Sequence, residues 1–192
     1  MLASLPIFPL PELLLFPGTF LPLHIFETRY RLLLDYSTES DYEIGITCFE
    51  SEGKITETLG WGKIIKIEPL ADGRSNILIQ GHGIAKIADY SSQEPFIIAK
   101  VEKMEADLKH LNQITFQDIL KSILELAKEF LSKAGVEPVF ISELDKLRYH
   151  SFPIEFISSI LNIDFQQKKQ LFLENDPLQK AENLENLLRK LL

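Results

Sequence analysis

Five side chains in this sequence are of the types best suited to catalysis or metal binding. They are His24, His82, His110, His150 and Cys48. No two of these histidines are spaced i, i+4 and none belongs to an H-E-x-x-H motif, so the sequence shows no pattern for a metal-binding helix. A single cysteine cannot form an intramolecular disulfide or a site that needs two thiolates. We therefore predict no metal ligands.

The surroundings of three of these residues give more specific expectations. Cys48 lies in a predicted strand, 42–49, where a small buried side chain is expected and a reactive thiol is the alternative. His24 also lies in an apolar segment, so we expect a partly buried ring with a hydrogen-bond partner. His82 lies between two glycines in a predicted turn, where exposure to solvent is expected.

Other catalytic motifs are missing from the sequence. Gly60-Trp61-Gly62 and Gly81-His82-Gly83 lack a third glycine and a following helix, so turn or bulge glycines are favoured over a phosphate site. The sequence contains no G-x-x-x-x-G-K-[ST] and no G-x-S-x-G motif. Carboxylate pairs, such as Asp35 with Glu39, have helical spacing and indicate a solvated surface. We expect a protein that is not an enzyme and needs no cofactor.

Composition and charge restrict the classes of partner. The 192 residues are 45% hydrophobic and 25% charged, with a net charge of -8. Acidic residues outnumber basic ones in both halves, which argues against a surface that follows nucleic-acid phosphates or docks on anionic lipid. The longest uncharged run, 13–26, is interrupted by prolines and is too short to span a membrane. With no signal sequence and one cysteine, we expect a soluble cytoplasmic protein that binds neither nucleic acid nor membrane.

The first part of the chain predicts a small twisted barrel. Prolines near the N-terminus indicate short, broken strands, and a helix is expected over 27–36. Asp72-Gly73 between two isoleucine-rich runs is a strong hairpin signal, whereas Gly81-His82-Gly83 is expected to interrupt the strand pattern. The later strands are predicted over 42–49, 61–70, 76–80, 84–90 and 96–104.

The second part of the chain has helical periodicity. Apolar residues from Phe116 to Ala134 recur at 3.6 spacing, and Gly135 and Pro138 are expected to end that helix. Further helices are predicted over 142–150, over 153–161 with Ser151 as the cap, after a capping box at 164–167, and after Asp176-Pro177. We expect two domains, 1–108 and 109–192, with the helical one packed against the barrel.

The pattern of the N-terminal segment carries a family resemblance. Residues 5–35, LPIFPLPELLLFPGTFLPLHIFETRYRLLLD, closely resemble the opening of the substrate-binding (N-terminal) domain of Lon-type ATP-dependent proteases. Leu59-Gly60, Asp72-Gly73-Arg74 and the stretch 81–87 lie where that family has its glycine and D-G-R motifs. Ala85-Lys86 departs from the usual Arg-Phe of the family. The resemblance covers nearly the whole chain and is strongest over 5–36 and 59–104.

This resemblance implies both a fold and a function. The implied fold class is α+β, a PUA-like six-stranded β pseudobarrel with one short helix, followed by a C-terminal α-helical bundle. In full-length Lon proteases the module precedes an ATPase and a peptidase with a Ser-Lys dyad, and it recognises polypeptides. This sequence contains neither, so we expect a stand-alone, non-catalytic member whose partners are unfolded or tagged protein segments.

The candidate contact residues lie around the first helix. A barrel with broken strands leaves edges and apolar side chains that can accept an extended chain. The apolar candidates have burial in the core as their alternative role, and the polar ones have scaffold ion pairs as theirs. The candidates are Phe16, Phe20, Phe26, Glu27, Thr28, Arg29 and Arg31.

Three other functions stay open at this point. An oligomerisation or adaptor module, forming a weak homo-oligomer, would use the leucine stripe 184–191, whose alternative is packing on its own bundle. RNA binding is a role of some PUA-like folds, but the negative charge opposes it. A small-molecule enzyme would need a cavity in the barrel and has no further support from the sequence.

Overall fold

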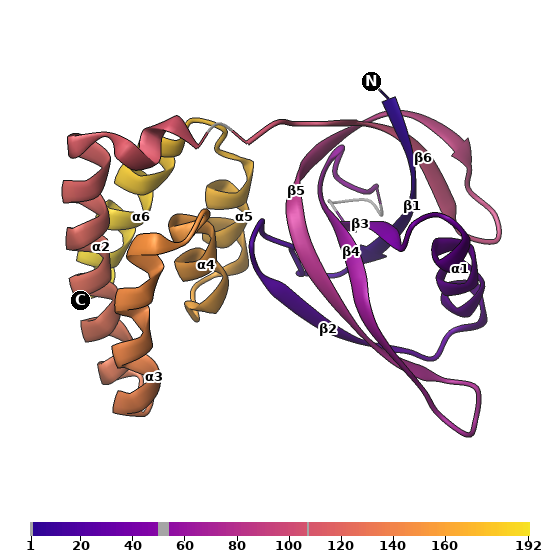
Figure 1. Ribbon diagram of the computed structural model, residues 1–192, viewed down its shortest axis with the longest axis horizontal. Helices are drawn as coiled ribbons and strands as arrows, with labels where there is room; N and C mark the ends of the chain where they lie inside the picture. The colour runs from indigo at the N-terminus through magenta and orange to yellow at the C-terminus, as the bar shows by residue number, and fades with distance from the viewer. Residues whose placement is uncertain (1, 50–53, 107) are drawn as a thin grey trace. The chain divides into compact units, whose positions relative to one another are not determined.

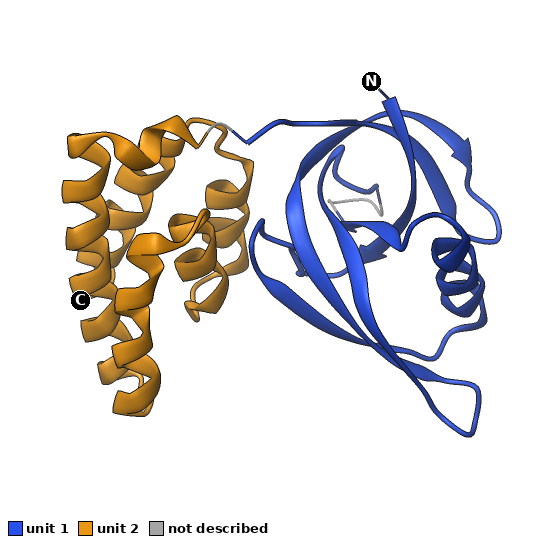
Figure 2. Ribbon diagram, viewed as in Figure 1, with its two compact units in different colours: residues 1–106 blue, residues 107–192 orange. Residues whose placement is uncertain are grey.

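The computed structural model describes residues 2–49, 54–106 and 108–192. The chain divides into two compact units, residues 1–106 and 107–192 (Figures 1 and 2). The first is built on a β-sheet and the second on helices, so the protein has the predicted α+β class. No helix among the described residues combines the length and the apolar character that crossing a membrane requires.

The first unit is a nearly closed sheet of six strands. Its elements are β1 (Leu2–Leu10), β2 (Phe20–Ile25), α1 (Thr28–Glu39), β3 (Glu43–Cys48), β4 (Thr58–Pro69), β5 (Ser75–Ser92) and β6 (Ile97–Lys103). The strand order is β2-β5-β4-β3-β1-β6, and β6 pairs again with β5. Five strands therefore form a ring, and β2 adds to it at the first half of β5. β1 and β3 are parallel, and the other pairs are antiparallel.

Strand β5 is longer than the sequence pattern indicated. The stretch 81–83, which we expected to interrupt two strands, lies inside one strand of 18 residues. Burial alternates without a break from Ile77 through Gly81 and Gly83 to Ala85. Period-2 burial is the signature of a strand with one face toward a core. The expectation of a turn was wrong because glycine was taken as a break, when it occupies inward positions of a continuous strand.

Gly81 in β5 and Gly60 in β4 make room for another part of the backbone. The segment between β1 and β2 passes so close that the Gly18 amide donates to the Gly81 carbonyl at 2.9 Å, and the Gly81 amide donates to the Thr19 carbonyl at 2.8 Å. A Cβ atom on Gly60 would lie 2.0 Å from the Leu15 carbonyl oxygen. Any side chain at this position would collide with fixed backbone, so the crossing requires glycine.

The barrel interior holds two groups of buried apolar residues. One lies under α1 and includes Ile44, Ile46 and Ile79, and the other includes Leu5 and Val101. Cys48 is fully buried in β3, in agreement with its predicted role as a small hydrophobe. The alternating residues of the strands thus supply a continuous apolar filling, which is the main source of stability for such a barrel.

The second unit is a helical bundle. Its elements are η2 (Lys109–Asn112), α2 (Ile114–Lys133), α3 (Pro138–Glu143), η3 (Leu144–Tyr149), α4 (Pro153–Ile160), α5 (Phe165–Leu173) and α6 (Pro177–Leu191). As expected, α2 ends before Gly135 and Pro138, and Pro138 also opens α3, because proline is favoured at the first helical position. Two other expectations were wrong. The helix expected over 142–150 begins at Pro138 as α3 and continues as the 3-10 helix η3 to Tyr149. Ser151 does not cap α4, whose N-cap is Phe152 without a side-chain cap bond.

The two aspartate caps are confirmed. The Asp164 carboxylate accepts from the Gln166 and Gln167 amides, and the Asp176 carboxylate accepts from the Gln179 amide. These bonds satisfy helix N–H groups that have no partner within the helix. The leucine stripe of α6 packs largely within the unit, because Leu184 and Leu188 are fully buried. Leu191, at the end of the helix, is 43% exposed.

Candidate functional site

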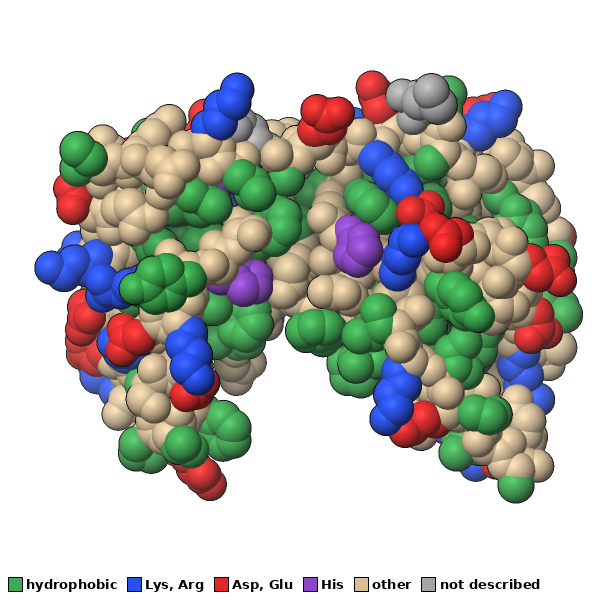
Figure 3. Space-filling view, in the orientation of Figure 1, with side chains coloured by type: hydrophobic (Ala, Val, Ile, Leu, Met, Phe, Trp, Pro, Cys, Tyr) green, Lys and Arg blue, Asp and Glu red, His purple; other side chains and the backbone are tan. Residues whose placement is uncertain are grey.

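Strand β2 presents an apolar face to solvent. Its residues alternate, with Phe20, Pro22 and His24 exposed and the leucines between them half-buried against the barrel core. Phe20 is 55% exposed, and Phe26, just after the strand, is 58% exposed. Figure 3 shows hydrophobic side chains gathered over this strand. Large apolar side chains exposed together are characteristic of an interaction surface.

The outer edge of β2 is open. Among the strands that the structure describes, β2 pairs with β5 alone, from Phe20 opposite Gln80 to Ile25 opposite Ser75. A strand with one paired side has peptide groups on its other side that another chain can meet. Pro22 in the middle of this edge lacks an N–H group, which weakens pairing with a further strand.

His24 belongs to this exposed face, although the sequence pattern predicted a partly buried ring. It is exposed, not partly buried as expected. Its Nδ1 atom is hydrogen-bonded to Asn76 Oδ1 at 2.8 Å, and its ring stacks with Phe26 at 6.1 Å between centroids. Pro22 and His24 were missed as surface candidates. The signal that identifies them is the period-2 phase they share with Phe20 and Phe26.

The polar candidates lie at the start of α1. Glu27 is the N-cap residue and forms an ion pair with Arg29 at 3.0 Å, and both side chains are well exposed. Arg29 also lies over the Tyr30 ring, 4.5 Å from its centroid. Burial raises the pKa of Tyr30 above its usual 10, so this ring stays neutral. Thr28 is exposed as the first helical residue. An exposed ion pair contributes little to stability, so Glu27 and Arg29 are available for contacts with a partner.

Two candidates are placed away from this surface. Phe16 is 1% exposed and lies within the barrel, so it is not available to a partner chain. Arg31 is half-buried, with its Nη1 atom near Gly73 in the β4–β5 hairpin. Its Nε atom is buried without a hydrogen-bond partner among the described residues. The structure therefore places Phe20 and Phe26 along one exposed strand face that leads to the start of α1, and leaves out Phe16 and Arg31.

A pocket adjoins the start of α1. It has a volume of about 530 Å³ and is lined by Arg29 and Tyr30 together with residues from β1 and from the loop before β6. Its charged lining residues are balanced, with Arg29 and Lys54 against Glu57 and Glu94. Balanced charge gives no preference for an ionic ligand.

One polar cluster on the barrel is held together by contacts among its own side chains, although the Trp61 Nε1 atom is buried without a hydrogen-bond partner among the described residues. The Lys103 ammonium donates to both carboxylate oxygens of Glu43, at 2.8 and 2.7 Å, and lies 3.8 Å from the centre of the Trp61 ring. His82 packs edge-on against the same ring at 5.3 Å and is half-buried, contrary to the expected exposure. Burial lowers the pKa of His82, and the Lys63 charge adds to this effect. The cluster fixes four strands to one another.

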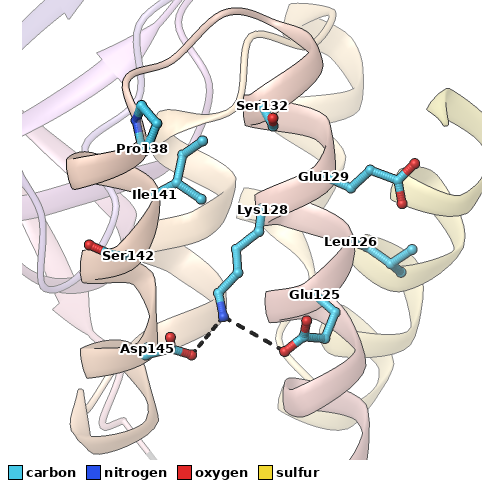
Figure 4. A pocket seen from close by; sticks show the side chains of 9 residues that line it. All are labelled: Glu125, Leu126, Lys128, Glu129, Ser132, Pro138, Ile141, Ser142 and Asp145. Carbon is cyan, nitrogen blue, oxygen red and sulfur yellow. Dashed lines mark hydrogen bonds and ion pairs between the residues drawn. The ribbon is translucent and has the colours of Figure 1, made fainter.

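A second pocket lies on the helical unit between α2 and the α3–η3 segment. It measures about 680 Å³ and is lined by Glu125, Glu129 and Asp145 (Figure 4). The Lys128 ammonium lies among these carboxylates, 2.8 Å from Asp145 and 3.7 Å from Glu125. It supplies the countercharge that a bound cation would otherwise bring. Within residues 2–49, 54–106 and 108–192, no three or more His, Cys, Asp or Glu side chains are arranged so that they could hold a metal ion.

The comparisons with known proteins show the family of the chain. The model of the family described as the ATP-dependent protease La (LON) substrate-binding domain matches residues 4–190. This chain belongs to that family. The Lon substrate-binding domain resemblance predicted from the N-terminal motifs is thereby confirmed.

Relatives and solved structures extend the same result. The Lon protease of Cytophaga hutchinsonii is 26% identical over 97% of this chain and 24% of its own length. That of Flavobacterium johnsoniae is 25% identical over 93% of this chain and 23% of its own. The N-terminal domain of a Mycobacterium avium complex Lon protease superposes with a TM-score of 0.80 at 16% identity, covering 99% of this chain and 100% of that domain. The chain spans about a quarter of the length of these two Lon proteases.

Proposed function

We propose that this Lon-family domain binds apolar segments of unfolded polypeptides and catalyses no reaction itself. The observation that carries the proposal is the outward face of β2, an edge strand, where Phe20 and the following Phe26 are both more than half exposed. Its membership of a family described as a substrate-binding domain supports the same assignment.

The sheet edge favours contact through side chains over extension of the sheet. Pro22 cannot donate a backbone hydrogen bond, and proline in an edge strand commonly protects against strand addition. Two phenyl rings and a proline ring leave apolar surface that an unfolded segment can cover. Burying one phenylalanine side chain stabilises a complex by about 1.5–3 kcal/mol, so the two rings together contribute about 3–6 kcal/mol before ordering costs are subtracted. A micromolar dissociation constant corresponds to about 8 kcal/mol, so we expect affinity in the micromolar range or weaker.

The charged start of α1 forms a polar rim beside this face. Glu27, Thr28 and Arg29 follow Phe26 directly and are exposed or partly exposed. A hydrophobic centre with a polar rim is the usual anatomy of a protein interface. The rim would select among apolar segments by the charges that flank them.

The test compares binding of a permanently unfolded, reduced and alkylated model protein with binding of its native form. Fluorescence anisotropy is expected to give binding of the unfolded form in the micromolar range or weaker, and none of the native form. Phe20→Ser with Phe26→Ser should weaken that binding at least tenfold, because each lost ring removes about 1.4 kcal/mol or more. Both rings are exposed, so the unfolding temperature of the variant should change little.

The matched control is Tyr149→Ser, which removes an aromatic ring that is 93% exposed on the helical unit. It should leave the affinity unchanged. Equal binding of native and unfolded protein, or full binding by the Phe20→Ser, Phe26→Ser variant, would contradict the proposal.

A further inference from the structure

The helical unit carries an apolar groove that the β2 surface does not include. Its volume is about 470 Å³, within the range of about 300–1,000 Å³ typical of ligand pockets. Seven of its eight lining residues are apolar, and the eighth is Glu143. Two of the apolar residues at its rim are exposed, Phe140 at 63% and Ile160 at 40%.

The wall formed by α2 results from the way that helix ends. Gly135, with φ +78°, reverses the chain after α2. The Val136 amide donates to the Leu131 carbonyl at 3.0 Å, and the Gly135 amide donates to the Ser132 carbonyl at 3.0 Å. These two hydrogen bonds at the helix end bring the residue after the glycine onto the last turn of the helix. Leu131 and Val136 consequently line the same side of the groove.

The opposite wall comes from one helical face. Phe140, Glu143, Leu144 and Leu147 follow the i, i+3, i+4, i+7 spacing along α3 and η3 and all line the groove. Leu144 and Leu147 are buried parts of the unit's core, so the floor is fixed. Phe140 stands above them, largely exposed, where a bound chain could cover it.

The backbone around this groove restricts what can occupy it. Residues 108–192, as far as the structure describes them, form helices and no strand. Peptide groups within a helix are already paired, so the walls offer no sheet edge to an extended chain. An occupant must therefore satisfy its own peptide groups, which an amphipathic helix does while presenting an apolar stripe.

The charge of the groove determines which charged residues are favoured beside the apolar stripe of the bound helix. Glu143 is the one charged residue among the lining residues of the groove. It forms an ion pair with Lys146, but both side chains are more than half exposed, so this pair competes only weakly with a basic residue of a partner for the Glu143 carboxylate. Burial of an apolar stripe beside a carboxylate favours a lysine or arginine next to the stripe.

We propose that this groove binds an amphipathic polypeptide helix whose apolar stripe is flanked by a basic residue. The site takes helical segments, whereas the β2 face takes unfolded ones. The two sites lie in different units and are tested separately.

The experiment titrates labelled synthetic helices of about 18 residues against the full chain. The first peptide, the lysine peptide, has leucines at i, i+3, i+4 and i+7 with flanking lysines. The second has glutamates in place of the lysines. The third contains the same residues as the lysine peptide in a scrambled order that has no apolar stripe. The lysine peptide is expected to bind at least tenfold more tightly than the scrambled one. Its helicity by circular dichroism should rise on binding.

Three variants locate the site. Phe140→Ser should weaken binding of the lysine peptide at least tenfold. The matched control is Val139→Ser, which should leave the affinity unchanged, because Val139 is similarly exposed, at 61%, but does not line the groove. Glu143→Lys should reverse the preference between the lysine and glutamate peptides. These substitutions are at exposed positions and should leave the unfolding temperature nearly unchanged.

The outcomes separate this proposal from that for β2. The Phe20→Ser, Phe26→Ser variant should bind the helical peptide normally, and Phe140→Ser should bind unfolded protein through β2 normally. Equal binding of the scrambled peptide, equal effects of Phe140→Ser and Val139→Ser, or an unchanged charge preference in Glu143→Lys would each overturn the groove proposal.

Discussion

Glycine has two separate roles in this molecule at the scale of single residues. At Gly60 the missing side chain allows the segment between β1 and β2 to cross the sheet, since a Cβ atom would lie 2.0 Å from the Leu15 carbonyl oxygen. At Gly135 there is open space around the residue, and the requirement is the positive φ of +78°. The first role is steric exclusion by backbone, and the second is conformational freedom.

These roles predict different costs for the same substitution. Gly60→Ala should destabilise the protein by about 3 kcal/mol or more, because neither backbone can move without breaking the sheet. Gly135→Ala should cost about 1–2 kcal/mol, the price of a left-handed conformation for a residue with a Cβ. Chemical denaturation of both variants measures the difference. Equal losses would show that the crossing segment can yield.

A buried ion pair links two elements of the helical unit. The Lys180 ammonium on α6 donates to the Glu155 carboxylate on α4 at 2.8 Å, and the side chains are 8% and 14% exposed. Two charges removed from water in this way gain little net stability as a pair. They become costly when one of them is left alone. The pair therefore fixes how α4 meets α6 more than it stabilises the bundle.

The pair predicts strongly non-additive mutations. Glu155→Leu should destabilise the protein by about 3–5 kcal/mol, because it leaves the Lys180 ammonium buried without its partner. Glu155→Leu combined with Lys180→Met should recover most of that loss. A double-mutant cycle by denaturant unfolding measures the coupling. Additive losses would show that water reaches Lys180 freely.

At the scale of the whole molecule, each unit has its own apolar core. The barrel contains two buried groups, and the bundle contains a third that includes Phe116, Leu124 and Ile157. None of the three groups draws buried residues from both units. Units of 106 and 86 residues are large enough to fold without disulfides or metals. That the bundle packs against the barrel stays a prediction.

Separate cores predict separate folding. Fragments 1–106 and 107–192, expressed apart, should each show a cooperative thermal transition by circular dichroism. The two proposed sites should stay with their units, so the barrel fragment should bind unfolded protein and the helical fragment the lysine peptide. A fragment without a cooperative transition would show that its core depends on the other unit.

The sequence alone determined the class, the family and most elements, because these depend on local signals. Alternation and D-G turn chemistry identified the β half, and 3.6 periodicity with aspartate caps at Asp164 and Asp176 identified the helical half. The N-terminal motifs identified the family. These features depend on residues that are close together in the sequence, so they can be recognised without knowledge of long-range contacts.

The tertiary structure alone decided which residues are exposed and where surfaces form. Phe16 and Phe20 read alike in the sequence, yet one is 1% and the other 55% exposed. The difference arises because the segment carrying Phe16 crosses the barrel at glycines from distant strands, while β2 pairs on one side. Likewise, the groove around Phe140 combines four elements whose meeting depends on packing. Whether Phe16 or Phe20 is exposed depends on non-local contacts, and no pattern within their shared segment distinguishes the two.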